Sequence, residues 1–218
     1  MAPALGSTHG PDPSRNGIAL LVGYQARLAA KTLAGMLVLS LLFVQLPLAA
    51  TNPWVGYMWT NPWKVLALMG GVFLLFPTLP PGSPELRFLG RASIAGPLLL
   101  GGFLLICGIQ HFVYADFVTQ LVPAWFPERR FWTYFTGTAL MAGGVGAVIP
   151  GTRRLAAPLS GLMIFLWVVL LHIPRALADP HDAGETSGIF EALALSGVAL
   201  ILAGATKAHS GRIPGAQT

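Results

Sequence analysis

Three ionisable side chains lie where uncharged apolar runs of this sequence begin or end. His111 and His172 each follow such a run, and Glu191 lies near the start of another. An ionisable group at membrane depth is costly unless it faces protein, a partner or water, so each is a functional candidate. An imidazole can hydrogen-bond a quinone carbonyl and exchange its proton, and a glutamate can relay that proton to water. The alternative is a structural His–Glu cluster that joins helices by hydrogen bonds.

The same residue types could also bind a metal or a haem. Two histidines on different helices at one depth suit bis-histidine ligation of haem, and Glu191 would complete a set for zinc or iron. The sequence has no HxxxH, ExxH or CxxCH spacing, so we assign no metal ligands and keep haem or metal as an alternative. A single cysteine, Cys107, can form neither an internal disulfide nor a CxxC motif. Redox chemistry would therefore need a bound cofactor.

Composition indicates the medium in which these groups lie. The chain has 218 residues, of which 54% are hydrophobic and 10% charged, with a mean hydropathy of +0.67. Soluble domains carry about 25% charged residues, so the composition predicts an all-α polytopic membrane protein in contact with the lipid bilayer. The formal charge is +5, but the basic residues flank apolar runs and form no stripe with interleaved aromatics. Nucleic acid is therefore not an expected partner.

Six apolar runs predict a bundle of six transmembrane helices: 32–50, 65–79, 92–109, 131–149, 155–171 and 188–205. With the N-terminus inside, nine Lys and Arg residues fall on the cytoplasmic side: Arg15, Arg27, Lys31, Arg87, Arg91, Arg153, Arg154, Lys207 and Arg212. Four fall on the other side: Lys64, Arg129, Arg130 and Arg175. The positive-inside rule therefore predicts that both termini are cytoplasmic.

These helices divide the chain into four predicted regions. Residues 1–17 are expected to form a disordered arm, and 18–91 an amphipathic segment at the headgroups followed by a two-helix hairpin. Residues 92–205 form a four-helix unit, and 206–218 a basic tail. Between the helices, we expect loops at 120–130 and at the acidic segment 179–187, and a short interfacial helix flanked by turns between the two Asn-Pro-Trp copies of 52–63.

The predicted topology brings the candidate residues into one layer. Odd-numbered helices end and even-numbered helices begin at the external face, so His111, His172 and Glu191 lie at a similar depth. Arg175 is three residues after His172 and falls on nearly the same helical face. We therefore expect His111, His172, Glu191 and Arg175 to face one external pocket, as its catalytic groups, with His111, Phe112, Tyr114 and Trp167 contacting a cofactor. The glycines of the helix 131–149 predict that it packs closely inside the bundle.

Three stretches carry a resemblance to a known family. The segment Gly108-Ile-Gln-His-Phe112, the glycine-rich stretch 137–146 and the segment 191–204 resemble DoxX-like membrane proteins. The resemblance extends over about residues 95–205. It implies that the last four helices form a DoxX-type bundle, preceded here by an extra helix pair. Some members are associated with thiosulfate:quinone oxidoreductase or with oxidative-stress complexes. His111 is the position that the resemblance carries over.

The resemblance implies a quinone-linked redox protein or redox-complex subunit in the bacterial cytoplasmic membrane, with a membrane or periplasmic redox partner. Whether the chain is itself an enzyme is left open; if it is, we expect a quinone-dependent membrane oxidoreductase. Two alternatives remain: a non-catalytic assembly or partner subunit of a larger complex, and a bis-histidine haem or metal-binding membrane protein.

Overall fold

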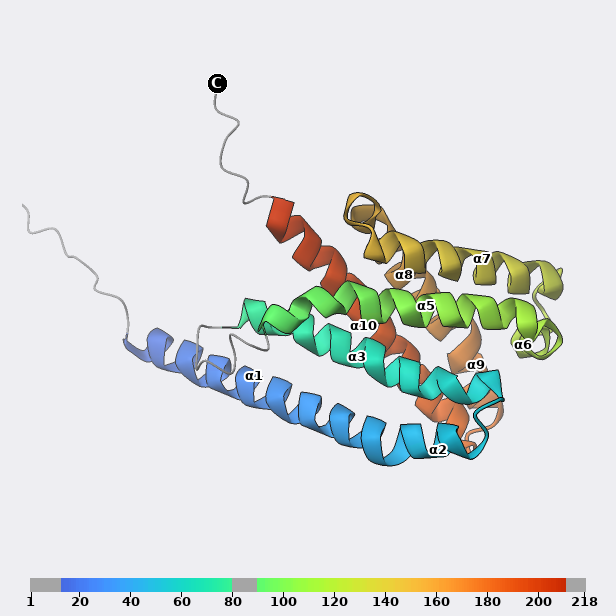
Figure 1. The fold of residues 1–218 in the computed structure, drawn as a ribbon, viewed down its shortest axis with the longest axis horizontal. Coiled ribbons are helices and arrows are strands. Elements are labelled where there is room, and N and C mark those ends of the chain that lie inside the picture. Colours follow the sequence, from blue (N-terminus) through green and yellow to red (C-terminus); the bar gives the residue numbers. More distant parts are fainter. Residues whose placement is uncertain (1–12, 80–89, 211–218) are drawn as a thin grey trace, which may run out of the picture.

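The computed structural model describes residues 13–79 and 90–210, with side chains for 25–79 and 90–206. Throughout these ranges the regular elements are helices, which confirms the predicted all-α class (Figure 1). The first twelve residues of the expected arm, most of the loop before the third predicted helix and the end of the basic tail lie outside the described residues. Helix α1 begins at Pro13, within the segment that was expected to be disordered.

The N-terminal segment forms a single continuous helical rod. Helix α1 (Pro13–Ser40) passes through the π-helical turn η1 (Leu41–Gln45) into α2 (Leu46–Thr51). A separate amphipathic segment at the headgroups was expected here, but nothing in the sequence between Ile18 and Gln45 stops a helix. Pro47, which lacks an N–H, lies in the first turn of α2, directly after the π turn that accommodates it.

Five further helices form a closed ring. They are α3 (Thr60–Leu75), α5 (Ala95–Val113), α7 (Arg129–Val148), α8 (Pro150–Trp167) and α10 (Ala183–Ser210). Each packs against the next, and α10 returns to α3, while α1 packs along α3 from outside (Figure 1). The core inside the ring consists mainly of small and branched residues: Ala67, Leu100, Leu104, Ala147, Ala157, Ala199 and Leu202. The last four helices alone do not close this ring, because α3 completes it.

Glycines let α5 and α7 approach at backbone distance. A methyl group on Gly101 would lie 2.7 Å from the Gly144 carbonyl oxygen, and one on Gly144 would lie 2.7 Å from the Gly101 oxygen. Two helical turns away, a methyl on Gly108 would lie 2.8 Å from the Gly137 oxygen. The glycine-rich helix was predicted to pack closely inside the bundle. Burial of its glycines confirms the close packing, but α7 is a member of the ring and its other face is exposed at Phe131, Phe135 and Val145.

The connecting elements gather at one end of the ring, which we call the α6 end (Figure 1). They are the 3-10 turn η2 (Gly56–Trp59), α6 (Ala115–Leu121), the π turn η5 (Val168–His172) and α9 (Ile173–Ala178). The structure corrects three expected boundaries here. The fifth helix does not stop at Leu171 but continues through Pro174, because η5 precedes that proline as η1 precedes Pro47.

The other two boundary corrections concern the loops. The acidic segment 179–187 is only partly a loop, because the Asp182 carboxylate accepts a 2.7 Å hydrogen bond from the Gly184 N–H and starts α10 at Ala183. The second Asn-Pro-Trp copy does not form a turn, because Pro62 lies in the first turn of α3, where its missing N–H costs no hydrogen bond.

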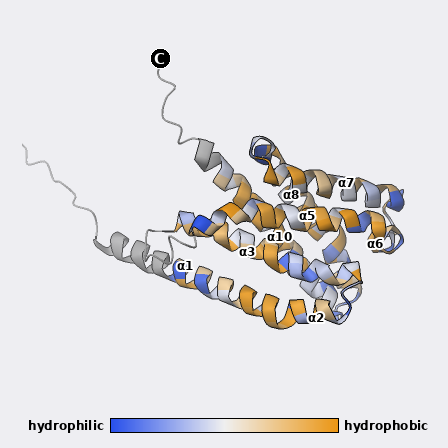
Figure 2. Ribbon diagram, in the orientation of Figure 1, coloured by the Kyte–Doolittle hydropathy of each residue, from blue (hydrophilic) through white to orange (hydrophobic). Residues whose placement is uncertain are grey.

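Four helical segments within the described residues are long and apolar enough to cross a membrane: Gln25–Thr51, Ala92–Val113, Pro150–Ala178 and Ala183–Thr206. Hydrophobic residues cover much of these segments, and hydrophilic residues gather towards the helix ends (Figure 2). Large apolar side chains are exposed along them, as in η1, where Phe43 is 73% exposed. The chain is therefore a multi-pass membrane protein whose exposed apolar surface suits lipid. Helices α3 and α7 are not among these four segments: α3 has only 16 residues, and α7 has 20 residues but begins with two arginines.

Candidate functional site

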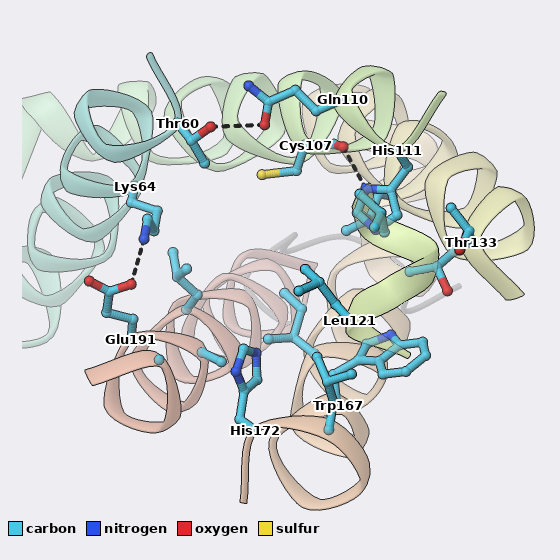
Figure 3. A pocket seen from close by; sticks show the side chains of 18 of the residues that line it. Thr60, Lys64, Cys107, Gln110, His111, Leu121, Thr133, Trp167, His172 and Glu191 are labelled. Carbon is cyan, nitrogen blue, oxygen red and sulfur yellow. Dashed lines mark hydrogen bonds and ion pairs between the residues drawn. The ribbon is translucent and has the colours of Figure 1, made fainter. Parts of the chain in front are cut away.

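A cavity of about 640 Å³ lies between the ring helices at the α6 end (Figure 3). Its lining combines apolar and polar side chains. The apolar lining is Phe103, Phe117, Val118, Leu121, Val122, Trp132, Leu140, Ile164, Trp167, Leu171, Ala192 and Leu195. The remaining lining residues are mostly polar: Tyr57, Thr60, Asn61, Lys64, Cys107, Gln110, His111, Thr133, Thr136, His172, Gly188 and Glu191. Such a cavity can bury an amphipathic molecule of small size.

His111 is held in one orientation by its own helix. Its Nδ1 atom lies 2.7 Å from the carbonyl oxygen of Cys107, one turn earlier on α5. A carbonyl can only accept a hydrogen bond, so Nδ1 carries the proton and donates it. In the neutral imidazole the lone pair is then on Nε2, which is left for a ligand because the ring lines the cavity.

An ion pair spans the opposite part of the cavity wall. The Lys64 Nζ atom on α3 lies 2.5 Å from a carboxylate oxygen of Glu191 on α10 (Figure 3). The Lys64 side chain is 23% exposed and that of Glu191 is 46% exposed. The pair connects α3 to α10 through two long side chains. The second carboxylate oxygen of Glu191 and two N–H groups of Lys64 take no part in this contact.

A side-chain amide ties α5 to the start of α3. The Thr60 hydroxyl donates to Gln110 Oε1 at 2.8 Å, and Gln110 Nε2 donates to the Gly56 carbonyl oxygen at 3.1 Å. Both ends of the Gln110 amide are therefore engaged beside His111. This contact stabilises the cavity wall, since it fixes η2 and α3 against α5.

His172 approaches the cavity from another side. It is the last residue of the π turn η5, and a methyl group on Gly188 would lie 3.1 Å from its Nδ1, so the glycine of α10 makes room for the ring. Figure 3 shows the imidazoles of His111 and His172 on different walls, with Leu121 between them in the view. Within the described residues no group of three or more His, Cys, Asp or Glu side chains is placed to hold a metal ion.

The structure separates the predicted site residues into two groups. His111, His172, Glu191 and Trp167 line the cavity, whereas Arg175, Phe112 and Tyr114 do not. Arg175 pairs with Glu185 instead, with its Nε atom 2.8 Å from the carboxylate, and so joins α9 to α10. Helical spacing placed Arg175 with His172, but the nearest available carboxylate lies away from the cavity.

The two aromatic exceptions follow from where α5 ends. Phe112 is one residue after His111, about 100° around the helix, and it stacks on Tyr134 of α7 with ring centroids 5.5 Å apart. Tyr114 leaves the helical conformation, with φ −112° and ψ 36°, and meets the Tyr57 ring edge-on at 6.1 Å. Both rings pack against neighbouring residues rather than forming the cavity wall.

Several polar lining residues were not among the predicted site residues. Lys64 could have been found, because it is a single base at the same predicted depth as Glu191. Cys107 also had a signal, since it precedes His111 by four residues and shares its helical face. Thr133 and Gln110 gave none, because hydroxyl and amide side chains are common in membrane helices and need not face a ligand.

Comparison with known proteins gives one match. A family model described as Domain of unknown function (DUF8561) matches residues 100–186. This stretch contains His111 and His172 but neither partner of the Lys64–Glu191 pair. No curated protein and no solved structure matches the chain. The part of the chain that is similar to this family therefore extends from α5 to the first turn of α10.

Proposed function

We propose that this chain spans the bacterial cytoplasmic membrane six times, with both termini in the cytoplasm, and that its cavity binds the head group of a quinone. Helices α3 and α7 would be the two additional spans. Both are members of the ring, and their small residues pack against its other helices. The excess of Lys and Arg on the predicted cytoplasmic side supports the orientation.

The observation that carries the quinone proposal is the lining of the cavity, which combines apolar and aromatic surface with polar groups. A quinone has a flat ring with two oxygens and an apolar tail, and it dissolves in the bilayer. The Lys64 ammonium can donate to a ring oxygen, His111 and Glu191 can accept from a ring hydroxyl of the reduced form, and Leu121 and Trp167 offer apolar and aromatic surface. A volume of about 640 Å³ lies within the range of small-molecule sites, roughly 300–1,000 Å³.

This site gives the chain a quinone-linked redox role, alone or as a subunit of a redox complex. The resemblance to DoxX-like proteins points to the same role. His111 and His172 can exchange protons with a ring oxygen, and Glu191 is exposed enough to pass them to water. Electrons would be exchanged with a membrane or periplasmic redox partner. A quinone-dependent enzyme and a quinone-binding subunit would share this cavity.

The test is quinone binding to the detergent-purified chain. Lipid extracts of the sample are analysed for quinone, and a short-chain quinone is titrated while tryptophan fluorescence is followed. Trp132 and Trp167 line the cavity, so saturable quenching is expected, and Trp167→Phe should remove part of it. Trp54→Phe is the matched control, because Trp54 is 94% exposed and does not line the cavity.

The absence of both bound quinone and saturable quenching would contradict the proposal. A visible spectrum of the same sample tests the haem alternative, which predicts a Soret band that shifts on reduction.

A further inference from the structure

Resting on the proposed quinone site, we infer that the cavity selects the reduced, hydroxyl-bearing form of its ring ligand, a quinol, over the quinone. The inference concerns the redox form of the ligand rather than the existence of the site. It follows from which hydrogen-bonding atoms near His111 are still free after the protein has made its own contacts.

His111 presents an acceptor to the cavity. Because Nδ1 donates to the Cys107 carbonyl oxygen at 2.7 Å, the neutral ring has an unprotonated Nε2. A quinol hydroxyl can donate to this atom. A quinone carbonyl cannot, and its lone pairs would face the lone pair of Nε2, which leaves a buried acceptor without a donor.

The polar side chains beside His111 already make contacts between helices. The Thr60 hydroxyl donates to Gln110 at 2.8 Å, and the Gln110 amide donates to the Gly56 carbonyl oxygen at 3.1 Å. Neither group can turn towards a quinone oxygen without breaking a contact between α5 and the start of α3. The second N–H of Gln110 is still available to a carbonyl oxygen, but it does not supply a donor to the lone pair of His111 Nε2.

The opposite wall does not reverse this preference. Lys64 keeps N–H groups that could serve a quinone oxygen, but the second carboxylate oxygen of Glu191 is an acceptor beside them. A quinol hydroxyl can donate to Glu191 and accept from Lys64, whereas a carbonyl can only accept. A hydroxyl can thus donate to His111 Nε2 at one wall or to the Glu191 carboxylate at the other, whereas a carbonyl supplies a donor to neither.

The test compares two matched ligand pairs on the full-length protein in detergent. The first pair is a short-chain quinol and its quinone, titrated without oxygen. The second is a 4-alkylphenol and its methyl ether, which have the same ring and differ in the donor hydrogen. We expect the quinol and the phenol each to bind about tenfold or more tightly than their partners, as expected for one unsatisfied buried acceptor.

His111→Ala should reduce both affinity ratios to less than about twofold, since the discriminating acceptor is gone. Val113→Ala is the control on the same helix, because Val113 is 64% exposed and lies outside the cavity, and it should keep both ratios. If His111→Ala does not fold, the phenol pair on the unchanged protein still decides the question.

The outcomes separate the two proposals. Equal binding of quinol and quinone, or tighter binding of the quinone, would overturn the selectivity and leave the quinone site standing. Equal binding of the phenol and its ether would also overturn it. If neither redox form binds, the proposed function itself fails, and the inference falls with it.

Discussion

Two helix–helix contacts of the ring, which we call seams, differ in how closely the helices approach each other. Along α5 and α7, glycines face each other at two levels, Gly101 with Gly144 and Gly108 with Gly137, seven residues apart on each helix. Along α3 and α10 the spacing is also seven residues. Gly71 meets Val198 at the first level, but at the second level the contact is the ion pair between Lys64 and Glu191.

The difference shows what creates the cavity. Backbones in contact through glycine leave no space between helices, so the α5–α7 seam stays closed at the cavity's level. Long charged side chains can span a wider gap, and at the same level they join α3 to α10. The seam with the ion pair therefore supplies polar groups to the cavity, and the glycine seam supplies rigidity. Four substitutions test this division.

Gly108→Ala should have the largest effect. The added methyl would lie 2.8 Å from the Gly137 carbonyl oxygen and 2.9 Å from the Met141 backbone nitrogen, so two backbones must separate. We expect the free energy of unfolding in mixed micelles to fall by about 2–3 kcal/mol. Gly197→Ala is the control, because nothing lies within 4 Å of a methyl there. Equal stability of the two variants would show that close backbone contact between α5 and α7 does not stabilise the bundle.

Lys64→Met should rank second. It leaves the Glu191 carboxylate without its partner at a position between surface and interior, where we expect a loss of about 1–2 kcal/mol. The double variant Lys64→Met, Glu191→Leu should recover most of this stability but not ligand binding. Thermal unfolding measures the first expectation, and fluorescence titration the second. Full binding by the stable double variant would show that the pair serves only to join helices.

Ser196→Ala should have a smaller effect, at a third seam. The fully buried Ser196 hydroxyl donates to the Gly161 carbonyl oxygen at 2.8 Å and links α10 to α8 away from the cavity. Interhelical hydrogen bonds in membranes contribute about 0.6 kcal/mol on average, so the unfolding free energy should drop by that order. Ligand affinity should not change; a large change would show that this seam also shapes the cavity.

Asp116→Asn should have the smallest effect. The carboxylate lies 3.1 Å from Arg130, but the two side chains are 86% and 64% exposed, so solvent screens the pair. We expect no measurable change in the melting temperature, at low or high salt. A marked drop would mean that this pair, which links α6 to α7, contributes more to stability than its exposure predicts.

Much of the fold could be predicted from apolar runs and helix-breaking residues. The centres of the six predicted helices lie within observed helices, because hydrophobic length and charge exclusion act locally along the chain. Boundaries near prolines were less predictable. The π turns before Pro47 and Pro174 let the helix continue, and nothing in the sequence distinguishes such a proline from one that ends a helix.

The sequence by itself determined that the chain has apolar helices long enough to cross a membrane and that His111 lies near the end of one of them. Only the tertiary structure decided that Lys64 is the partner of Glu191, that α3 completes the ring, and that Phe112 and Arg175 turn away from the cavity. Helical periodicity orders side chains around one axis. The rotation of each helix and the choice of its neighbours depend on contacts between residues far apart in the chain, which no local pattern encodes.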